Sequence, residues 1–140
     1  MAEVQKGFFW HVHHEVLIEW CYNYNERASF IRTDKRENEQ ETRLRLFKPV
    51  KGTLPREVVE AWQANVKAGQ ISSKAWRAYY KAGQFRDKEW RAYGEALQAL
   101  DKAWRAYGEA LRKNMPAIEA LHKKECHNCP WDGKTIFPGS

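Results

Sequence analysis

The C-terminal part of the chain carries the residues whose types and spacing best suit metal binding. Cys126 and Cys129 are separated by two residues, a spacing that lets two thiolates bind one tetrahedral metal ion. His122 lies four residues before Cys126, so its imidazole could supply a third ligand if this segment is helical. We therefore predict a structural Zn²⁺ site here. The alternatives are two ordinary reduced thiols, or a redox or disulfide pair with Cys21 as a third participant.

The fourth ligand has several candidates. His127 follows Cys126 directly, and three histidines stand near the N-terminus, at positions 11, 13 and 14. The predicted metal-ligating residues are Cys126, Cys129, His122, His127 and His13, with His11 and His14 as further candidates for the last position. Such a site would fasten the C-terminal tail to the N-terminal segment.

The N-terminal histidines also suit a second kind of chemistry. Alternate residues of a strand point to the same side, so His11, His13 and Glu15 would share one face of an extended segment. Two imidazoles and a carboxylate could serve a metal-dependent hydrolase or nuclease. No nucleophile motif or second carboxylate cluster stands nearby in the sequence. A half-exposed strand face is therefore favoured over catalysis.

Basic residues raise the question of nucleic-acid binding. Lys and Arg outnumber Asp and Glu by 24 to 18, which gives a net charge of +6. One basic cluster comprises Arg43, Arg45, Lys48 and Lys51, and further basic residues are spread over positions 77–113. Acidic residues dilute the second group, and phosphate binding needs positive charge gathered on one face. A solvated helix surface is the favoured interpretation, and nucleic-acid binding is a further alternative.

An internal repeat dominates the second half of the chain. Trp62, Trp76, Trp90 and Trp104 are each fourteen residues apart, and the surrounding segments align without gaps. Alanine precedes three of these tryptophans, and tyrosine follows three of them by three residues. Fourteen residues are two heptads, which predicts helices with an apolar stripe that faces a partner.

The heptad register predicts which residues make that contact. With Trp90 at position a, large apolar residues follow a 3-4 spacing as far as Leu111, and alanines occupy positions c and g. The predicted interface residues are Trp76, Tyr79, Trp90, Tyr93, Leu97, Trp104, Tyr107 and Leu111. The apolar arc is wider than the seam of a two-stranded coil, so we expect a helix that contacts two neighbours in a bundle.

Capping residues and glycines predict where the helices begin and end. Gly69 and Gly83 occupy positions where the later repeats carry leucine, which favours helix ends there. We therefore expect helices near 55–68, 73–82 and 87–114, and a last one over Ala117–Lys124 after Pro116. One unbroken helix over 73–114 is the alternative.

Residues 1–54 are different in pattern. GFFWHVHHEVLIEW is rich in aromatic and β-branched residues, which predicts a long strand or a hairpin. A short helix is expected over Asn25–Thr33, capped by Asn23 or Asn25, and a strand over Thr42–Phe47. The fold class predicted is α+β: a small N-terminal antiparallel sheet with one short helix, then a mainly helical region of 14-residue repeats. The expected domains are 1–54, 55–124 and 125–140.

Composition excludes several classes of protein. Hydrophobic residues make up 43% of the chain and charged residues 30%, which is typical of a globular protein rather than a disordered one. No window approaches the roughly 18 apolar residues of a membrane span. The first residues lack the layout of a secretion signal, because Glu3, Lys6 and Glu15 interrupt any apolar run.

Two stretches resemble a known group of proteins. The Ala-Trp-x-x-Tyr repeats that end in ALHKKECHNCPWDGKTIF resemble small bacteriophage and prophage proteins, which carry variable numbers of helical repeats and a Cys-Pro-x-Cys-Pro-Trp tail. HVHHEVL and ETRLRLFKPVKGTLP are similar to their leading domain. His127 stands where that group frequently has proline, which leaves the ligand set open. The resemblance implies a cytoplasmic accessory protein of phage type and no particular activity.

These observations together favour a non-enzymatic interaction protein. We expect it to self-associate, or to bind a host protein such as a defence factor, through the repeat stripe. A metal-dependent hydrolase using the N-terminal histidines and a nucleic-acid-binding protein are the alternatives.

Overall fold

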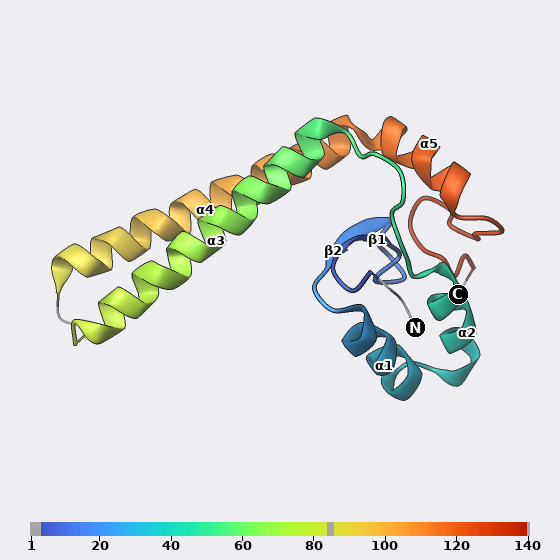
Figure 1. The fold of residues 1–140 in the computed structure, drawn as a ribbon, viewed down its shortest axis with the longest axis horizontal. Coiled ribbons are helices and arrows are strands. Elements are labelled where there is room, and N and C mark those ends of the chain that lie inside the picture. Colours follow the sequence, from blue (N-terminus) through green and yellow to red (C-terminus); the bar gives the residue numbers. More distant parts are fainter. Residues whose placement is uncertain (1–3, 84–85, 140) are drawn as a thin grey trace. The chain divides into compact units, whose positions relative to one another are not determined.

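The computed structural model describes residues 4–83 and 86–139. The elements in chain order are β1 (Gly7–Trp10), β2 (Ile18–Cys21), α1 (Tyr24–Asp34), α2 (Glu37–Leu46), β3 (Lys48–Pro49), α3 (Arg56–Lys81), α4 (Asp87–Lys113) and α5 (Met115–Glu125) (Figure 1). The predicted fold class is confirmed, because a small antiparallel sheet precedes a mostly helical region. Two positions of the second repeat, Gln84 and Phe85, lie outside the described residues.

The chain forms two compact units. The first combines Met1–Thr53 with Ala120–Ser140, and we call it the head. The second, Leu54–Glu119, contains α3 and α4, and we call it the hairpin unit. The tail that carries Cys126 and Cys129 therefore belongs to the same unit as the N-terminal sheet.

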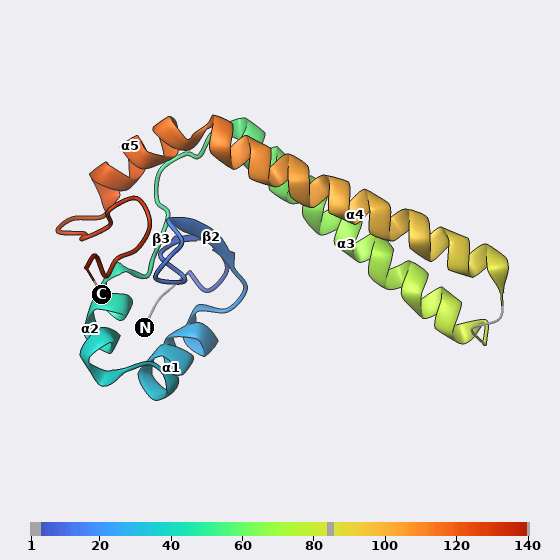
Figure 2. The ribbon, with the colours of Figure 1, turned by 180° about the vertical axis from the view of Figure 1, so that it is seen from behind.

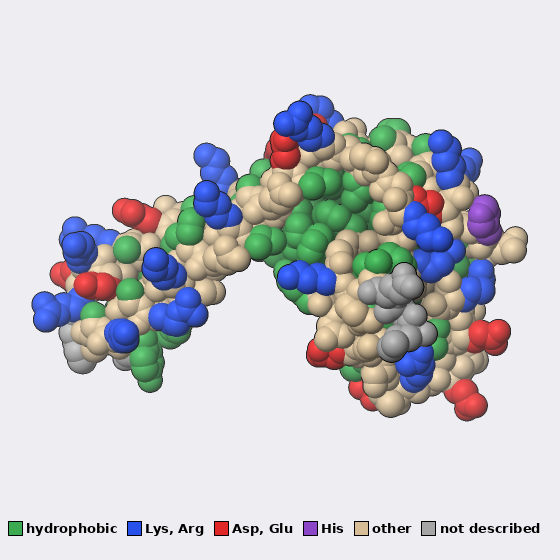
Figure 3. Space-filling model, in the orientation of Figure 1, with side chains coloured by type: hydrophobic (Ala, Val, Ile, Leu, Met, Phe, Trp, Pro, Cys, Tyr) green, Lys and Arg blue, Asp and Glu red, His purple; other side chains and the backbone are tan. Residues whose placement is uncertain are grey.

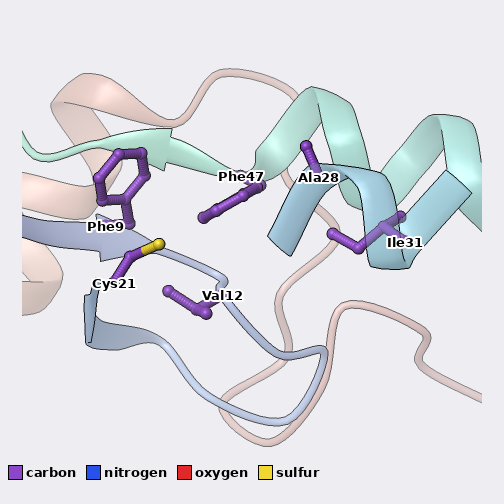
Figure 4. Packing of buried hydrophobic residues seen from close by; sticks show 6 residues of the cluster. All are labelled: Phe9, Val12, Cys21, Ala28, Ile31 and Phe47. Atoms are coloured by element: carbon purple, nitrogen blue, oxygen red, sulfur yellow. The ribbon is translucent and has the colours of Figure 1, made fainter. Parts of the chain in front are cut away.

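The sheet of the head has the strand order β2-β1-β3, and both pairings are antiparallel. β1 and β2 form the predicted hairpin, with Trp10 opposite Ile18. A core of apolar side chains lies between this sheet and α1, and Figure 4 shows Phe9, Val12, Cys21, Ala28, Ile31 and Phe47 within it. Cys21 is thus a buried core residue. Each strand is only four residues or fewer, so the helix is needed to cover the apolar face.

The two short helices of the head show one correct prediction and one error. α1 is the predicted helix, and the Asn23 side chain caps it by accepting a hydrogen bond from the amide of Glu26 at 3.0 Å. The predicted strand over 42–47 is wrong, because residues 42–46 form the second half of α2 and only Phe47 lies beyond it. The residues of α2 are mostly strong helix formers, and Glu39 pairs with Arg43 one turn later at 3.1 Å.

α3 and α4 lie side by side and antiparallel (Figures 1 and 2). Gly83 has a φ of +83°, a conformation that suits glycine, and it follows the end of α3. The alternative of one helix over 73–114 is therefore wrong. The predicted helices 55–68 and 73–82 are also wrong, because α3 runs through Gly69 and Ser72 without a break. α3 is packed at this point, because Ser72 is buried and a Cβ at Gly69 would lie 4.0 Å from Leu100 Cδ1 of α4. Tertiary contact of this kind outweighs the unfavourable helix propensity of one glycine.

Aromatic rings join the two long helices along their length. Trp62 lies 5.8 Å from Trp104 and 5.1 Å from Tyr107, measured between ring centroids. Nearer the turn, Tyr79 lies 5.0 Å from Trp90. The pairs Trp62–Tyr107 and Trp90–Tyr79 occupy equivalent repeat positions 28 residues apart, although Trp62 is buried and Trp90 is exposed.

The chain turns again after α4. The Asn114 side chain donates a hydrogen bond to the Ala110 carbonyl at 2.8 Å, and α5 begins at the next residue with Pro116 in its first turn. The expected restart of the helix near Pro116 is confirmed. Across residues 4–83 and 86–139, no helix is both long and apolar enough to cross a membrane.

Candidate metal centre

Four side chains of the head converge on one point. His11, His122, Cys126 and Cys129 each offer one ligand atom, and these atoms lie within 4.8 Å of one another. The first three residues are at most 7% exposed, and Cys129 is half-buried. A tetrahedral Zn²⁺ with bonds of 2.0–2.3 Å places its ligand atoms roughly 3.3–3.8 Å apart. The cluster could therefore bind a metal ion with small side-chain adjustments.

Each ligand reaches the cluster through a definite local structure. His122 and Cys126 stand four residues apart at the end of α5, so both point to one side. A turn with Asn128 at a φ of +54° then brings Cys129 back toward Cys126. Asparagine tolerates this left-handed conformation better than most residues. The Cys-x-x-Cys segment is thus shaped to present both sulfur atoms together.

His11 comes from the loop that follows β1. It follows directly on β1 and has a φ of +52°, a conformation uncommon for a residue with a side chain. Its backbone amide donates to the Leu17 carbonyl at 3.0 Å, which helps to hold that conformation. Backbone strain of this kind often occurs at functional sites. With this backbone conformation, the His11 imidazole lies against His122 of α5.

The hydrogen bonds of His11 suit a ligand. Its Nδ1 lies 3.2 Å from the Val16 carbonyl, so with a metal ion bound Nδ1–H would donate to that carbonyl and Nε2 would offer its lone pair to the ion. That Nε2 lies 3.0 Å from Nε2 of His122 and 3.3 Å from Sγ of Cys129. Both imidazoles therefore aim the same kind of nitrogen at the sulfur atoms.

The surroundings shift the pKa values of the two thiols in opposite directions. A hydrogen bond between Cys126 and Cys129 raises the pKa of Cys126 and lowers the pKa of Cys129. Burial raises the pKa of both thiols further, whereas hydrogen bonds from His11 and His122 lower that of Cys129. Cys129 is therefore the group that ionises first, and thiolate is the form that binds metal.

Basic side chains from α2 and β3 hold the turn around the cysteines. The Arg45 guanidinium donates to the carbonyls of His127 and Asn128 at 3.3 and 3.1 Å. The Lys48 ammonium donates to the Glu125 carbonyl at 3.1 Å. Both positive charges lower the pKa of Cys126, against the larger effects that raise it. They belong to the basic cluster considered for nucleic acid, but here they serve contacts within the head.

Glu125 ties the end of α5 to the sheet. Its carboxylate accepts hydrogen bonds from Trp10 Nε1 at 3.1 Å and from the amides of Lys51 and Gly52 at 2.7 and 2.6 Å. Burial alone would raise the pKa of Glu125, but these hydrogen bonds outweigh it and lower the pKa. Because Glu125 adjoins Cys126, the contact also positions a candidate ligand.

Apolar groups surround the cluster. Cys126 packs with Leu46 and Ile136, and the Trp131 ring lies 5.3 Å from that of His11. The Ile136 amide donates to the His14 carbonyl at 2.9 Å, which fixes the tail over the loop after β1. Such surroundings restrict the access of water to the ligands.

The structure brings three of the predicted ligands together and leaves two outside. His122, Cys126 and Cys129 join the cluster. His13 instead contacts Glu19 at 2.7 Å on the surface, and His127 is exposed next to the cysteine turn. The fourth donor is His11, which was among the alternatives. The strand ends at Trp10, so His11 and His13 do not share the face expected for a hydrolase site.

The predicted interface residues of the repeats divide into two groups. Tyr107 is only 7% exposed, and Tyr79, Tyr93 and Leu111 are half-buried. The other four are exposed by 42–55%: Trp76, Trp90, Leu97 and Trp104. α4 buries residues at its d and g positions, Ala96, Tyr107 and Ala110, whereas Trp90, Leu97 and Trp104 at position a stay at least 42% exposed.

Sequence reasoning did not assign the roles of Arg45, Lys48 and Glu125. Their contacts join residues 73 to 83 positions apart, or more, so no local pattern marks them. Comparison with protein-family models, curated proteins and solved structures gives no match at a significant level.

Proposed function

We propose that this chain is a non-enzymatic interaction protein, in which a structural Zn²⁺ stabilises the head and the hairpin unit carries the contact surface. The partner is a second copy or a host protein, in the cytoplasm of a phage-infected cell. The observation that carries the proposal is the exposure of Trp90, Leu97 and Trp104, which follow one another every seven residues along α4. Tryptophan is among the residues most enriched in the energetic centres of protein interfaces.

The donor set supports zinc as the metal. Two thiolates and two imidazoles match the Cys₂His₂ set of structural zinc sites, with both nitrogens and sulfurs able to reach a tetrahedral ion. Hard cations such as Mg²⁺ and Ca²⁺ prefer oxygen ligands instead. Four protein ligands fill a tetrahedral site, whereas a catalytic zinc keeps one position for water or substrate. The donor set therefore supports a structural role rather than a hydrolase.

The exposed aromatic stripe supports protein contact more than nucleic-acid contact. α4 carries six basic side chains (Lys88, Arg91, Lys102, Arg105, Arg112 and Lys113) and five acidic ones (Asp87, Glu89, Glu95, Asp101 and Glu109). Figure 3 shows basic and acidic side chains interspersed along the visible side of the hairpin unit. A nearly balanced surface gives little of the counterion release that drives binding to phosphates. An apolar stripe with a mixed polar rim is typical of protein interfaces.

Site-specific photocross-linking tests the contact surface. A photoreactive amino acid replaces Leu97 on the exposed stripe, and in a matched control it replaces Ala92, which is exposed at position c. After irradiation of cells that contain the protein, position 97 is expected to give a discrete protein adduct and position 92 none. Absence of any protein adduct at position 97, or an adduct with nucleic acid alone, would refute the proposed contact.

Metal content tests the zinc site separately. Elemental analysis of untagged protein is expected to give about one Zn per chain, and Co²⁺ substitution should give the absorption bands of a tetrahedral thiolate site. A protein that binds no zinc after refolding with excess zinc under reducing conditions contradicts this part of the proposal.

A further inference from the structure

The exposed stripe of α4 alternates large and small residues. Trp90, Leu97 and Trp104 occupy position a, and one turn later position e holds Gly94, Asp101 and Gly108. Residues at i and i+4 are neighbours on a helix surface, so each tryptophan stands beside a glycine. Each end of the stripe therefore has one tryptophan ring beside one glycine, and the two ends are 14 residues apart.

Among the residues that the structure describes, no close neighbour requires glycine at these two positions. A Cβ at Gly94 would meet no heavy atom within 4 Å, and one at Gly108 would meet only the flexible end of Arg112 at 3.5 Å. Both lie inside α4 with helical conformation, where alanine is a better helix former. Glycine at such a position lets another backbone or a bulky side chain approach closely.

We infer that a second copy of this chain covers the stripe, with the two α4 helices packed antiparallel about a two-fold axis and each tryptophan seated in a glycine gap of the partner. The inference rests on the proposed function and names the partner of that surface.

Sequence spacing makes the surface complementary to itself. In an antiparallel pair, the positions of facing residues add to a constant. Trp90 then faces Gly108 of the partner subunit, and Trp104 faces the partner's Gly94. The same alignment sets Leu97 opposite the partner's Asp101, and all three layers share a midpoint at the level of residue 99. A single two-fold axis thus relates all three layers, as an isologous interface requires.

The exposed apolar area of the stripe suits a small interface. Each tryptophan that is half exposed offers about 100 Å² to a partner, because a tryptophan side chain buries roughly 150–250 Å² in full. Trp90 and Trp104 are exposed by 55 and 50%, and Leu97 by 42%. The stripe therefore offers more than half of the roughly 450 Å² of apolar area that an ordinary interface contributes per partner.

Three variants of the intact chain, kept in zinc and reductant, test this geometry by analytical ultracentrifugation between about 1 and 100 μM. Gly94→Leu fills the gap and should raise the dimer dissociation constant tenfold or more. Ala92→Leu adds the same bulk at an exposed position outside the stripe and should leave the constant within about threefold. Gly94→Ala should weaken the dimer yet raise the Tm of the dilute, monomeric protein by about 2–8 °C.

Gly94→Ala is expected to weaken the dimer and to raise the Tm of the monomer. This combination distinguishes a glycine that serves dimer contact from a glycine that serves folding of the chain. A dimer that Gly94→Leu leaves intact overturns the inference, as does one that Ala92→Leu weakens equally. A protein that stays monomeric at 100 μM also overturns it. If position 97 still cross-links to a different protein in cells, the proposed function stands without the second copy. If it cross-links to nothing, both are refuted.

Discussion

The head and the hairpin unit bury their aromatic side chains to different extents. In the head, Phe9, Trp10 and Phe47 are at most 2% exposed, because strands, helices and the tail enclose them from several sides. In the hairpin unit, Trp90 and Trp104 remain 55 and 50% exposed, because two helices cover only one stripe of each other. The head encloses these rings within itself, whereas the hairpin unit leaves apolar surface exposed. Four changes test this contrast.

The largest effect is expected for loss of a ligand. Cys126→Ser should abolish zinc binding and reduce the stability of the head by on the order of 5 kcal/mol or more, because metal binding contributes directly to folding. Most of the helical signal in circular dichroism should persist, because α3 and α4 lie in the other unit. His127→Ala and His13→Ala are the controls, and neither should change the zinc content. Equal zinc loss in a control would show that the ligand set is wrong.

Trp62→Ala should have the next largest effect, now within the hairpin unit. Trp62 is 6% exposed and contacts both Trp104 and Tyr107, so its loss should cost about 3–5 kcal/mol. Trp90→Ala, at an equivalent repeat position but 55% exposed, should cost about 1 kcal/mol. Thermal unfolding of dilute protein measures both, and zinc content should remain unchanged. Similar costs for the two would contradict the asymmetric burial of the repeats.

Glu125→Gln should weaken the head more modestly. The carboxylate accepts three hydrogen bonds but is partly exposed, so we expect a loss of about 1 kcal/mol at pH 7. Because folding lowers its pKa, this stability is present above the ordinary pKa of 4.5 and is lost as the pH falls through the lowered value. The difference between wild type and variant in denaturant unfolding should therefore shrink below about pH 4.5. A difference that grows on acidification would contradict the assigned hydrogen bonds.

Gly83→Ala is expected to have a small effect, confined to the hairpin unit. The φ of +83° that follows α3 is strained for a residue with a Cβ, at a cost of about 1–2 kcal/mol, although nothing would obstruct the added atom. Gly94→Ala, at a helical φ, should have the opposite sign. Chemical denaturation of monomeric protein distinguishes the two, and a stabilising Gly83→Ala would show that the turn does not need a left-handed residue.

Prediction from the sequence succeeded where the signal was local. The cap at Asn23 defined α1, and the 14-residue period defined the interior of α4. It failed where tertiary contact overrode a local signal. Gly69 and Ser72 resemble a helix end, yet packing against α4 carries α3 through them. Alternation over residues 42–47 resembled a strand, but the helix-forming residues before it extend through the segment as α2.

The sequence by itself determined the spacing of the candidate ligands His122 and Cys126 at the end of α5 and the repeat of the hairpin unit, because both follow from helical periodicity within a short segment. Only the tertiary structure decided that His11, 111 residues before His122, completes the four-residue candidate cluster, and that Arg45, Lys48 and Glu125 contact the segment around its cysteines. The same holds for which apolar stripe of α4 stays exposed. The apolar arc of α4 is wider than one seam, so the rotation of the helix against α3 selects the stripe, and no local pattern encodes that rotation.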